Sequence, residues 1–320
     1  MLLAATVTRK RKVDRVAPEL RNAALFAMPP LRPALIPLTQ RLLRIRKAKA
    51  PIGVRMTERR LSGTAGNPDV RVLILEREGS GGTRPALLWL HGGGYLIGTP
   101  EIDLTLLARV LERLDVIVVS VDYRLAPRDP FPAALDDAMT ALRWLREQGE
   151  ALGIDRDSIA IGGNSAGGGL AAALAQRAHD EDVPLAFQLL MYPMLDDRTV
   201  LRTEHGNRGE LIWTPRENRF GWTSYLGQPP GDDAPAYAAP ARRHDLVGLP
   251  PAWIGVGSLD LFHDEDVAYA QRLLAAGVSC VLEVVADAPH AFDLLNFDTA
   301  TARAFHDGMI DALASGYAEI

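Results

Sequence analysis

The amino-acid sequence predicts an α/β fold with a doubly wound, mostly parallel sheet of about eight strands flanked by helices. Two observations support this prediction. Short apolar runs alternate with longer helical stretches along most of the chain, which is the order of elements in α/β domains. Most of these runs lack an alternation with polar residues, as expected of strands that helices cover on both faces. A length of 320 residues suits one large domain with an insertion.

The predicted strands follow one another along the chain. Runs at residues 54–57 and 70–75 are expected to be early antiparallel strands, because they alternate or are rich in β-branched residues. Later strands are expected at residues 86–90, 116–121, 159–161, 187–191, 253–256 and 281–285. Between them, residues 131–149 have the pattern of an amphipathic helix with Pro132 in its first turn.

Residues 196–250 interrupt this order, since they carry no strand pattern and are rich in proline and glycine. A structureless loop of this length is rare in a compact domain, so we expect an ordered insertion. Together with residues 1–50 it is predicted to form a small helical cap over the carboxyl end of the sheet, where open α/β sheets bind ligands. The main domain then comprises residues 51–195 and 251–320.

The charge is unevenly distributed. The net charge is −5, but residues 1–50 hold 12 Lys or Arg against 2 Asp or Glu, and the other residues hold 23 against 38. We interpret the first segment as a basic arm docked on an acidic body, with a membrane-surface or partner-binding arm as the alternative. No long amphipathic helix with a clean apolar face is expected there. Nucleic acid is disfavoured as a partner, because the acidic body would repel phosphate.

The remaining composition points to a cytoplasmic protein. A single cysteine, Cys280, excludes an internal disulfide and is expected to be a buried strand thiol. No apolar run is long enough for a membrane span, so no stable membrane insertion is expected. The apolar residues 1–7 precede the basic cluster at 9–12, the reverse of a signal peptide. No pair of histidines has metal-ligand spacing, and neither a metal nor a cofactor is expected.

A nucleophilic serine is predicted at Ser165. The sequence Gly-Asn-Ser-Ala-Gly at residues 163–167 follows a short strand and precedes a helix rich in small residues, as a nucleophile elbow requires. The flanking glycines are needed because side chains there would collide with the tight turn, and the helix start adds a positive dipole. A dinucleotide-binding loop is the weaker alternative, because no G-x-G-x-x-G spacing follows the first strand.

Serine needs a base, and the base needs an orienting carboxylate. The expected chain order is serine, acid, histidine. Asp260 and His290 both lie just past the end of a predicted strand and are assigned as acid and base, with Asp264, Glu265 and Asp287 as alternatives for the acid. The helical histidines His179 and His306 are expected at the surface.

A second glycine-rich motif follows the strand at 86–90. In His-Gly-Gly-Gly-Tyr at residues 91–95, three glycines let backbone N–H groups point into a cavity and stabilise an oxyanion. The N–H of Ala166 would complete the set of donors. We expect His91 to orient the loop and not to act as a base. Together with the serine motif, this pattern indicates acyl transfer.

These motifs resemble the bacterial hormone-sensitive-lipase family of α/β-hydrolase esterases. The resemblance rests on four strings that occur in order, at residues 90–95, 122–127, 131–134 and 163–168, and it covers about residues 50–320. It implies the α/β-hydrolase fold with a cap, an oxyanion hole at Gly93, Gly94 and Ala166, and activity on small acyl esters. A homodimer is compatible with it.

Four positions depart from the family pattern without removing a triad atom. Asn164 stands where aspartate is frequent, Leu261 where proline usually follows the acid, Ala291 where glycine is common, and Arg128 where glutamate is usual. Their effect is expected in the surroundings of the triad, and through them in pH optimum and rate.

The sequence therefore predicts a carboxylic-ester hydrolase that cleaves small, short-chain acyl esters through an acyl-enzyme. Tyr95, Asn164 and Trp213 are candidate substrate contacts. A lactonase or amidase with the same triad is an alternative, and a membrane-associated lipase is another. A non-catalytic small-molecule receptor, as in the plant gibberellin receptors, belongs to a different class. Such a receptor is expected to lack a working base, whereas His290 is present.

Overall fold

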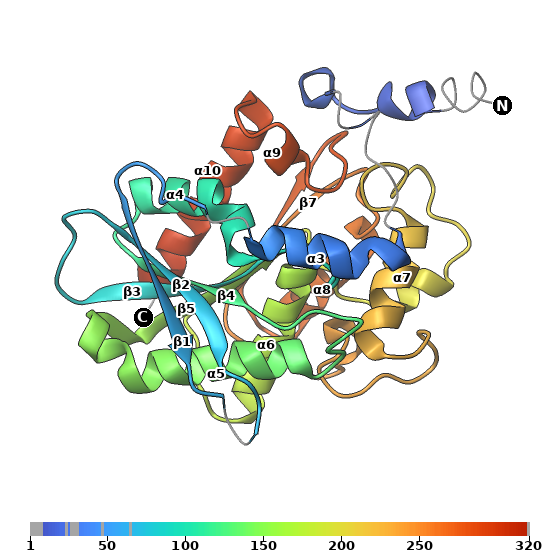
Figure 1. Cartoon of the computed structure of the whole chain (residues 1–320). Helices are drawn as coiled ribbons and strands as arrows, with labels where there is room; N and C mark the ends of the chain where they lie inside the picture. The colour runs from blue at the N-terminus through green and yellow to red at the C-terminus, as the bar shows by residue number, and fades with distance from the viewer. Residues whose placement is uncertain (1–8, 23–24, 26–31, 46–47, 64–65, 319–320) are drawn as a thin grey trace.

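The computed structural model describes residues 9–22, 25, 32–45, 48–63 and 66–318, and the apolar segment 1–7 lies outside them. The described residues form one sheet of eight strands in the order β1-β2-β4-β3-β5-β6-β7-β8 (Figure 1). The strands are β1 (Val54–Leu61), β2 (Val70–Arg77), β3 (Arg84–Leu90), β4 (Ile117–Asp122), β5 (Ile154–Asn164), β6 (Phe187–Met191), β7 (Ala252–Gly257) and β8 (Cys280–Val285). β2 runs antiparallel to its neighbours β1 and β4, and the strands from β3 to β8 are parallel. The predicted α/β architecture with antiparallel early strands is confirmed.

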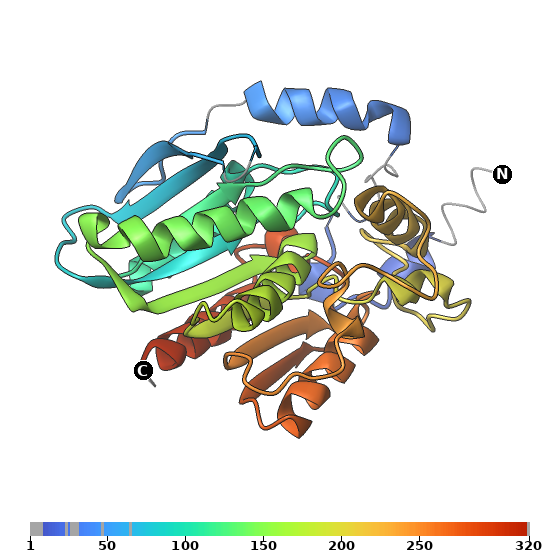
Figure 2. The same ribbon diagram turned by 90° about the horizontal axis from the view of Figure 1, so that it is seen from below.

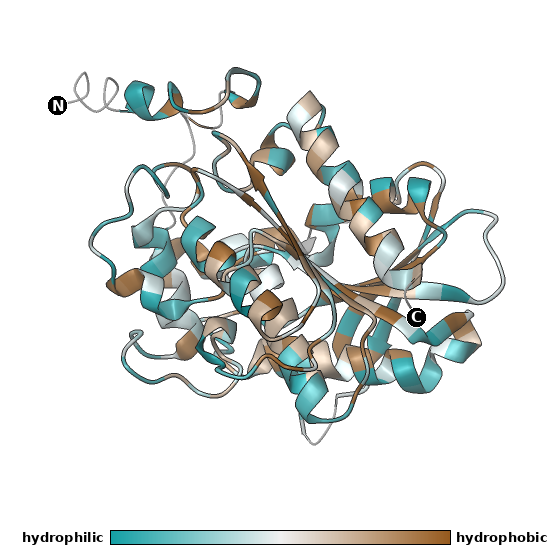
Figure 3. Ribbon diagram, turned by 180° about the vertical axis from the view of Figure 1, so that it is seen from behind, coloured by the Kyte–Doolittle hydropathy of each residue, from teal (hydrophilic) through white to brown (hydrophobic). Residues whose placement is uncertain are grey.

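Helices cover both faces of the sheet (Figure 2). The longer ones are α3 (Ile36–Ile45), α4 (Leu104–Arg113), α5 (Ala133–Gln148), α6 (Ala166–Asp180), α7 (Pro215–Leu226), α8 (His263–Ala275) and α10 (Ala300–Ala318). α5, α6 and α8 share one hydrophobic core with the sheet, and α4 and α10 share the other. The strands are the most apolar part of the fold, as Figure 3 shows, because most of them are buried on both sides.

The last strand, β8, does not follow the expectation of burial on both faces. It lies at the edge of the sheet beside β7, and Val281 and Val284 are 56% and 43% exposed. Cys280 at its start is half-buried instead of buried, and this burial raises the pKa of its thiol to about 12. The run of apolar residues predicted the strand correctly, but an apolar pattern does not tell a central strand from an edge strand.

The amino-terminal segment holds α3 and the insertion holds α7. Phe220 of α7 packs against the small apolar cluster that Ile36 of α3 forms with Leu96 and Ala126. The 196–250 range otherwise contains short 3-10 turns, as expected of an ordered segment without strands. Within the part of the chain that the structure describes, no helix has both the length and the apolar character that crossing a membrane requires.

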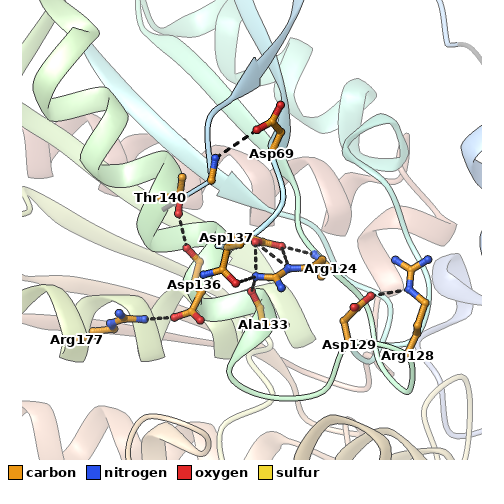
Figure 4. A network of polar contacts seen from close by, with 11 residues as sticks. Asp69, Arg124, Arg128, Asp129, Ala133, Asp136, Asp137, Thr140 and Arg177 are labelled. Carbon is orange, nitrogen blue, oxygen red and sulfur yellow. Dashed lines mark hydrogen bonds and ion pairs between the residues drawn. The ribbon is translucent and has the colours of Figure 1, made fainter. Parts of the chain in front are cut away.

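An ion pair between the half-buried Arg124 and the buried Asp137 fixes the chain after β4, as shown in Figure 4. The guanidinium of Arg124 donates from Nε and Nη2 to both carboxylate oxygens of Asp137 on α5, at 2.8 to 3.0 Å. The same carboxylate accepts from the backbone N–H of Arg124 at 2.8 Å, and Nη2 also donates to the carbonyl of Ala133 at 3.2 Å. Burial raises the pKa of Asp137, and the hydrogen bonds from Arg124 oppose this rise. Arg128 lies in the same loop but is exposed and contacts only Asp129 among the described residues.

We predict that Arg124→Lys lowers the free energy of unfolding by about 2–3 kcal/mol although the charge is kept, because an ammonium group cannot reproduce the forked hydrogen bonds to a buried carboxylate. Arg128→Lys is the matched control and is expected to change it by less than about 0.5 kcal/mol. Urea denaturation of both variants measures this difference. Equal stability of the two variants would contradict the prediction.

Candidate active site

Ser165 lies at a sharp turn between β5 and α6. Its φ of 54° and ψ of −121° are unfavourable for a serine, and the turn is held by its N–H, which donates to the Met191 carbonyl at 2.9 Å. The glycines of the motif make this turn possible. A Cβ atom added at Gly163 would lie 2.4 Å from the Leu90 carbonyl oxygen, and one added at Gly167 would lie 2.0 Å from the same atom. The steric reason predicted for both glycines is thus visible in the turn.

Ser165, His290 and Asp260 form one line of hydrogen bonds. Ser165 Oγ lies 2.9 Å from His290 Nε2, and His290 Nδ1 lies 2.7 Å from Asp260 Oδ2. Because a carboxylate only accepts, Nδ1 carries the proton and Nε2 is free to accept from the serine hydroxyl. The other oxygen of Asp260 accepts from the N–H of Phe262 at 3.0 Å, and all three side chains are buried.

The alternative acids lie elsewhere. Glu265 accepts from the backbone N–H groups of Leu195 and Asp196, and burial raises its pKa to about 8. Asp264 is exposed and pairs with Arg208. Asp287 forms no hydrogen bond with His290 among the described residues, and its N–H donates to Ser258 Oγ. Asp260 is the carboxylate that the structure brings to the histidine.

The glycine loop after β3 faces the serine. Gly93 and Gly94 have φ values of 123° and 63°, and a Cβ atom at either would lie about 2 Å from another atom, Ile97 O or the Trp213 ring. Among the described residues, the N–H groups of Gly93, Gly94 and Ala166 donate no hydrogen bond within the protein. These donors are therefore available to an oxyanion beside Ser165.

His91 anchors this loop, as expected. Its ring is fully buried, stacks on Tyr123 with 4.2 Å between the ring centroids, and places Nδ1 2.8 Å from the Gly92 carbonyl oxygen. The hydroxyl of Tyr123 donates to the His91 carbonyl at 2.6 Å. Tyr123 is followed directly by Arg124, so the ion pair of Arg124 with Asp137 in Figure 4 fixes the chain next to the tyrosine that supports the glycine loop.

A cavity of about 460 Å³ opens above the serine. Its lining comes from both the main domain and the predicted cap: Arg9, Gly92, Gly93, Gly94, Ile97, Ile102, Asn164, Ser165, Tyr192, Glu210, Leu211, Ile212, Trp213, Thr214, Arg216, Glu217, His290, Ala291 and Leu294. Of the candidate substrate contacts, Asn164 and Trp213 line it. Tyr95 does not, since it is buried and stacked on Tyr225 at 3.8 Å, and we no longer propose it as a substrate contact.

A buried carboxylate holds the residue before the nucleophile, which sequence reasoning missed. Asp103 accepts from Asn164 Nδ2 at 2.9 Å and from Trp89 Nε1 at 2.8 Å, and all three side chains are buried. Burial raises the pKa of Asp103 to about 6, and the two donors oppose the rise. The departure at Asn164 therefore has a physical consequence: an amide donates to Asp103, where an aspartate would face it with a second carboxylate.

A second buried network was also missed. Tyr192, one residue past β6, has its ring 5.0 Å from the His290 ring and donates to Asp293 Oδ1 at 2.8 Å. Asp293 Oδ2 accepts from His306 Nε2 at 2.9 Å, and His306 Nδ1 accepts from Arg109 at 2.8 Å. The expectation that His306 lies at the surface is wrong, because it is fully buried. His179 is exposed, as expected.

The other three departures lie in different surroundings. Arg128 is exposed and does not line the cavity. Ala291 lines the cavity with a φ of 53°, a conformation in which glycine is favoured, so alanine introduces strain next to His290. Leu261 is buried against the chain at Gly209, and nothing in the structure explains the absence of proline there.

A serine, a histidine and a carboxylate joined by hydrogen bonds, beside free N–H donors, form the arrangement found in serine hydrolases.

Comparison with known proteins shows the family to which the chain belongs. Residues 87–294 match the family described as alpha/beta hydrolase fold. The chain is 33% identical to "Esterase LipI" of Mycobacterium tuberculosis over 276 residues, 85% of each chain. The solved structure "Bacterial Heroin Esterase" has a TM-score of 0.86 at 34% identity and covers 95% of this chain and 99% of that one.

The chain therefore belongs to the α/β-hydrolase family, and the resemblance to the bacterial hormone-sensitive-lipase esterases is confirmed. One relative is of a different class. "Gibberellin receptor GID1A" of Arabidopsis thaliana is 30% identical over 232 residues, 70% of this chain and 67% of the receptor.

We predict that Asn164→Asp lowers kcat by about tenfold or more above neutral pH and less in acid. Two carboxyl groups about 3 Å apart cannot both ionise without repulsion, so the turn at Ser165 is disturbed once their shared proton is lost. Adding Asp103→Asn is expected to restore activity. The new amide at position 103 then donates to the carboxylate at 164 and accepts from Trp89, which keeps every hydrogen bond.

The measurement is kcat against pH for wild type, the single variant and the double variant. Comparison with wild type separates the new titration from that of the base. A double variant as impaired as the single one would show that the pair does not act through this hydrogen bond.

Proposed function

We propose that this carboxylic-ester hydrolase acts on small, short-chain acyl esters, with Ser165 as nucleophile, His290 as base and Asp260 as the acid that orients His290. The observation that supports this assignment is the line of hydrogen bonds at 2.7 and 2.9 Å from Asp260 through His290 to Ser165, at the base of the cavity. The relatives named as esterases agree with the reaction class.

In the first half of the reaction, Ser165 Oγ attacks the ester carbonyl carbon while His290 Nε2 takes the hydroxyl proton. Asp260 stabilises the imidazolium that forms, since it accepts from Nδ1. The former carbonyl oxygen becomes negative and is stabilised by the N–H groups of Gly93, Gly94 and Ala166. Removing one such donor typically costs 10²–10³-fold in kcat in enzymes of this type.

The imidazolium then gives its proton to the alcohol oxygen, the bond from that oxygen to the acyl carbon breaks, and the alcohol leaves. Water repeats the sequence on the acyl-enzyme: His290 takes a proton from the water, its oxygen attacks the acyl carbon, and the proton returns to Ser165 as the carboxylic acid is released.

The cavity supports the preference for small substrates. Its volume of about 460 Å³ lies in the lower part of the range of small-molecule pockets, and Leu211, Ile212 and Trp213 of the 196–250 segment give it an apolar wall. We propose that this segment and residues 1–50 form the cap that limits acyl-chain length, because Arg9 and Trp213 both line the cavity. The cytoplasmic location and the homodimer stay predictions.

Other reactions on the same site are less well supported. A lactone or an activated amide could be attacked by the same serine, but "Esterase LipI" and "Bacterial Heroin Esterase", which resemble this chain over most of its length, are both named as esterases. A receptor function needs no base, whereas Nε2 of His290 lies within hydrogen-bond distance of the serine hydroxyl here.

We predict that wild type releases p-nitrophenol from acyl esters with a maximum at short chains, and that Ser165→Ala abolishes this turnover while the protein stays folded. Esters whose acyl chains have from about two to about sixteen carbons should be compared for both proteins, because a small pocket discriminates among chains over a range of this order. Turnover by Ser165→Ala at the wild-type rate would overturn the assignment of the nucleophile, and no turnover by folded wild type would redirect the search to lactones and amides.

We predict that Asp260→Asn lowers kcat by a factor on the order of 10⁴, because the amide would place its NH₂ group against Nδ1 and leave Nε2 protonated, unable to accept from Ser165. Asp264→Asn, in the first turn of α8, is the matched control and should retain activity, since Asp264 is exposed and touches neither triad partner. Urea denaturation shows that both variants fold. Near-normal turnover of Asp260→Asn would mean that another carboxylate holds the histidine.

A further inference from the structure

The helix α3 presents leucine side chains to solvent. Leu35, directly before the helix, and Leu38 and Leu42 within it are 48%, 54% and 60% exposed. Their spacing of three and four residues places them on one side of the helix. Single exposed leucines are ordinary, but a contiguous apolar stripe on a surface usually marks an interaction site. The expectation for this segment concerned a long helix, whereas α3 is a helix of 10 residues.

The opposite side of α3 attaches the helix to the protein. Ile36 is buried against Leu96 and Ala126. The side-chain amide of Gln40 donates to the carbonyl oxygens of the same two residues, at 2.8 and 3.1 Å. Figure 2 shows α3 as the blue helix along the outer edge of the molecule. The leucine stripe is thus held outward by a fixed helix and is not needed for this attachment.

The chain around α3 is basic. No Asp or Glu occurs between Glu19 and Glu58. The same stretch contains eight basic residues, Arg21, Arg32, Arg41, Arg44, Arg46, Lys47, Lys49 and Arg55. Arg32 and Arg41 are exposed beside the leucines. The charge of the rest of the chain is strongly negative, so an anionic surface would attract this side of the protein and repel the other.

We propose that α3 docks the protein on lipid surfaces that contain anionic headgroups. Leu35, Leu38 and Leu42 enter the boundary between headgroups and acyl chains, and the exposed side chains of Arg32, Arg41 and Lys49 meet the phosphates. An apolar stripe beside basic residues is the pattern of helices that lie in the plane of a membrane interface. This docking is independent of the proposed function and goes beyond it.

A second copy of the chain fits the stripe less well. A twofold pairing places each patch against the same patch of the other copy, so two basic segments without an acidic residue would face each other. An anionic lipid surface supplies both the apolar layer for the leucines and the opposite charge. It would also bring the cavity close to the lipid, because Ile97 lines the cavity and packs against the Ile36 cluster.

The test is co-sedimentation of the full chain with vesicles of phosphatidylglycerol and phosphatidylcholine, and with vesicles of phosphatidylcholine alone. Wild type is expected to bind the anionic vesicles and to bind the neutral ones more weakly. Binding should weaken between about 0.01 M and about 1 M salt, as the Debye length falls from ~30 to ~3 Å. The double variant Leu38→Gln/Leu42→Gln should lower binding about tenfold or more, and Arg41→Gln should lower it less.

Matched controls are Leu274→Gln on α8, where the leucine is 53% exposed, and Arg303→Gln on α10, where the arginine is exposed. Both should bind as wild type does. Turnover of p-nitrophenyl acetate reports folding of each variant and should not change. The proposal is overturned by a wild type that does not bind anionic vesicles, by a double variant that binds as well as Leu274→Gln, or by a wild-type dimer in sedimentation velocity that the double variant dissociates.

Discussion

The site depends on the contact between two backbones where β3 and β5 leave the sheet side by side. The Leu90 carbonyl lies so close to both glycines around Ser165 that no Cβ atom fits at either position. This contact brings the turn at Ser165, where φ is 54°, against the glycine loop that follows Leu90. The serine and the N–H donors thus face the same cavity because two neighbouring strands end next to each other, which is also why the two motifs occur as a pair.

The sequence predicts the parts of the site that depend on strand ends. Ser165, Asp260 and His290 each follow a strand of the parallel block, and the carboxyl ends of parallel strands meet at one edge of the sheet. The contacts of Asp103 with Asn164 and of Asp293 with Tyr192 join residues 61 and 101 positions apart through side-chain packing, and no local pattern marks them. His306 differs, because it falls within the apolar stripe of α10, and that spacing could have shown its burial.

The two buried carboxylates that no sequence pattern marks, Asp103 and Asp293, have a common chemical consequence. Asp103 and Asp293 are held by neutral donors, namely Trp89 and Asn164 for the first and Tyr192 and His306 for the second, so no cation contacts either carboxylate within the described residues. Burial first, then Asp293, Asp103 and Asp260 raise the pKa of Tyr192, whose ring lies against His290. These negative groups favour the imidazolium that His290 forms during acyl transfer. The effect is strong in a buried environment, where charge is weakly screened.

Apolar patterns mislead at the borders of the fold for a physical reason. Such a pattern indicates that a side chain is stable against an apolar surface, but it does not indicate which part of the protein, or which other surface, covers that side chain. β8 is the last strand of the sheet in the described chain, and no further strand pairs with its outer edge, so Val281 and Val284 stay exposed. At α3 the buried Ile36 and the hydrogen bonds of Gln40 attach the helix, and the leucines on the other side belong to none of the buried apolar clusters of the described residues. Leucines that folding does not require, within a segment free of acidic residues, are therefore best explained by a surface outside the chain.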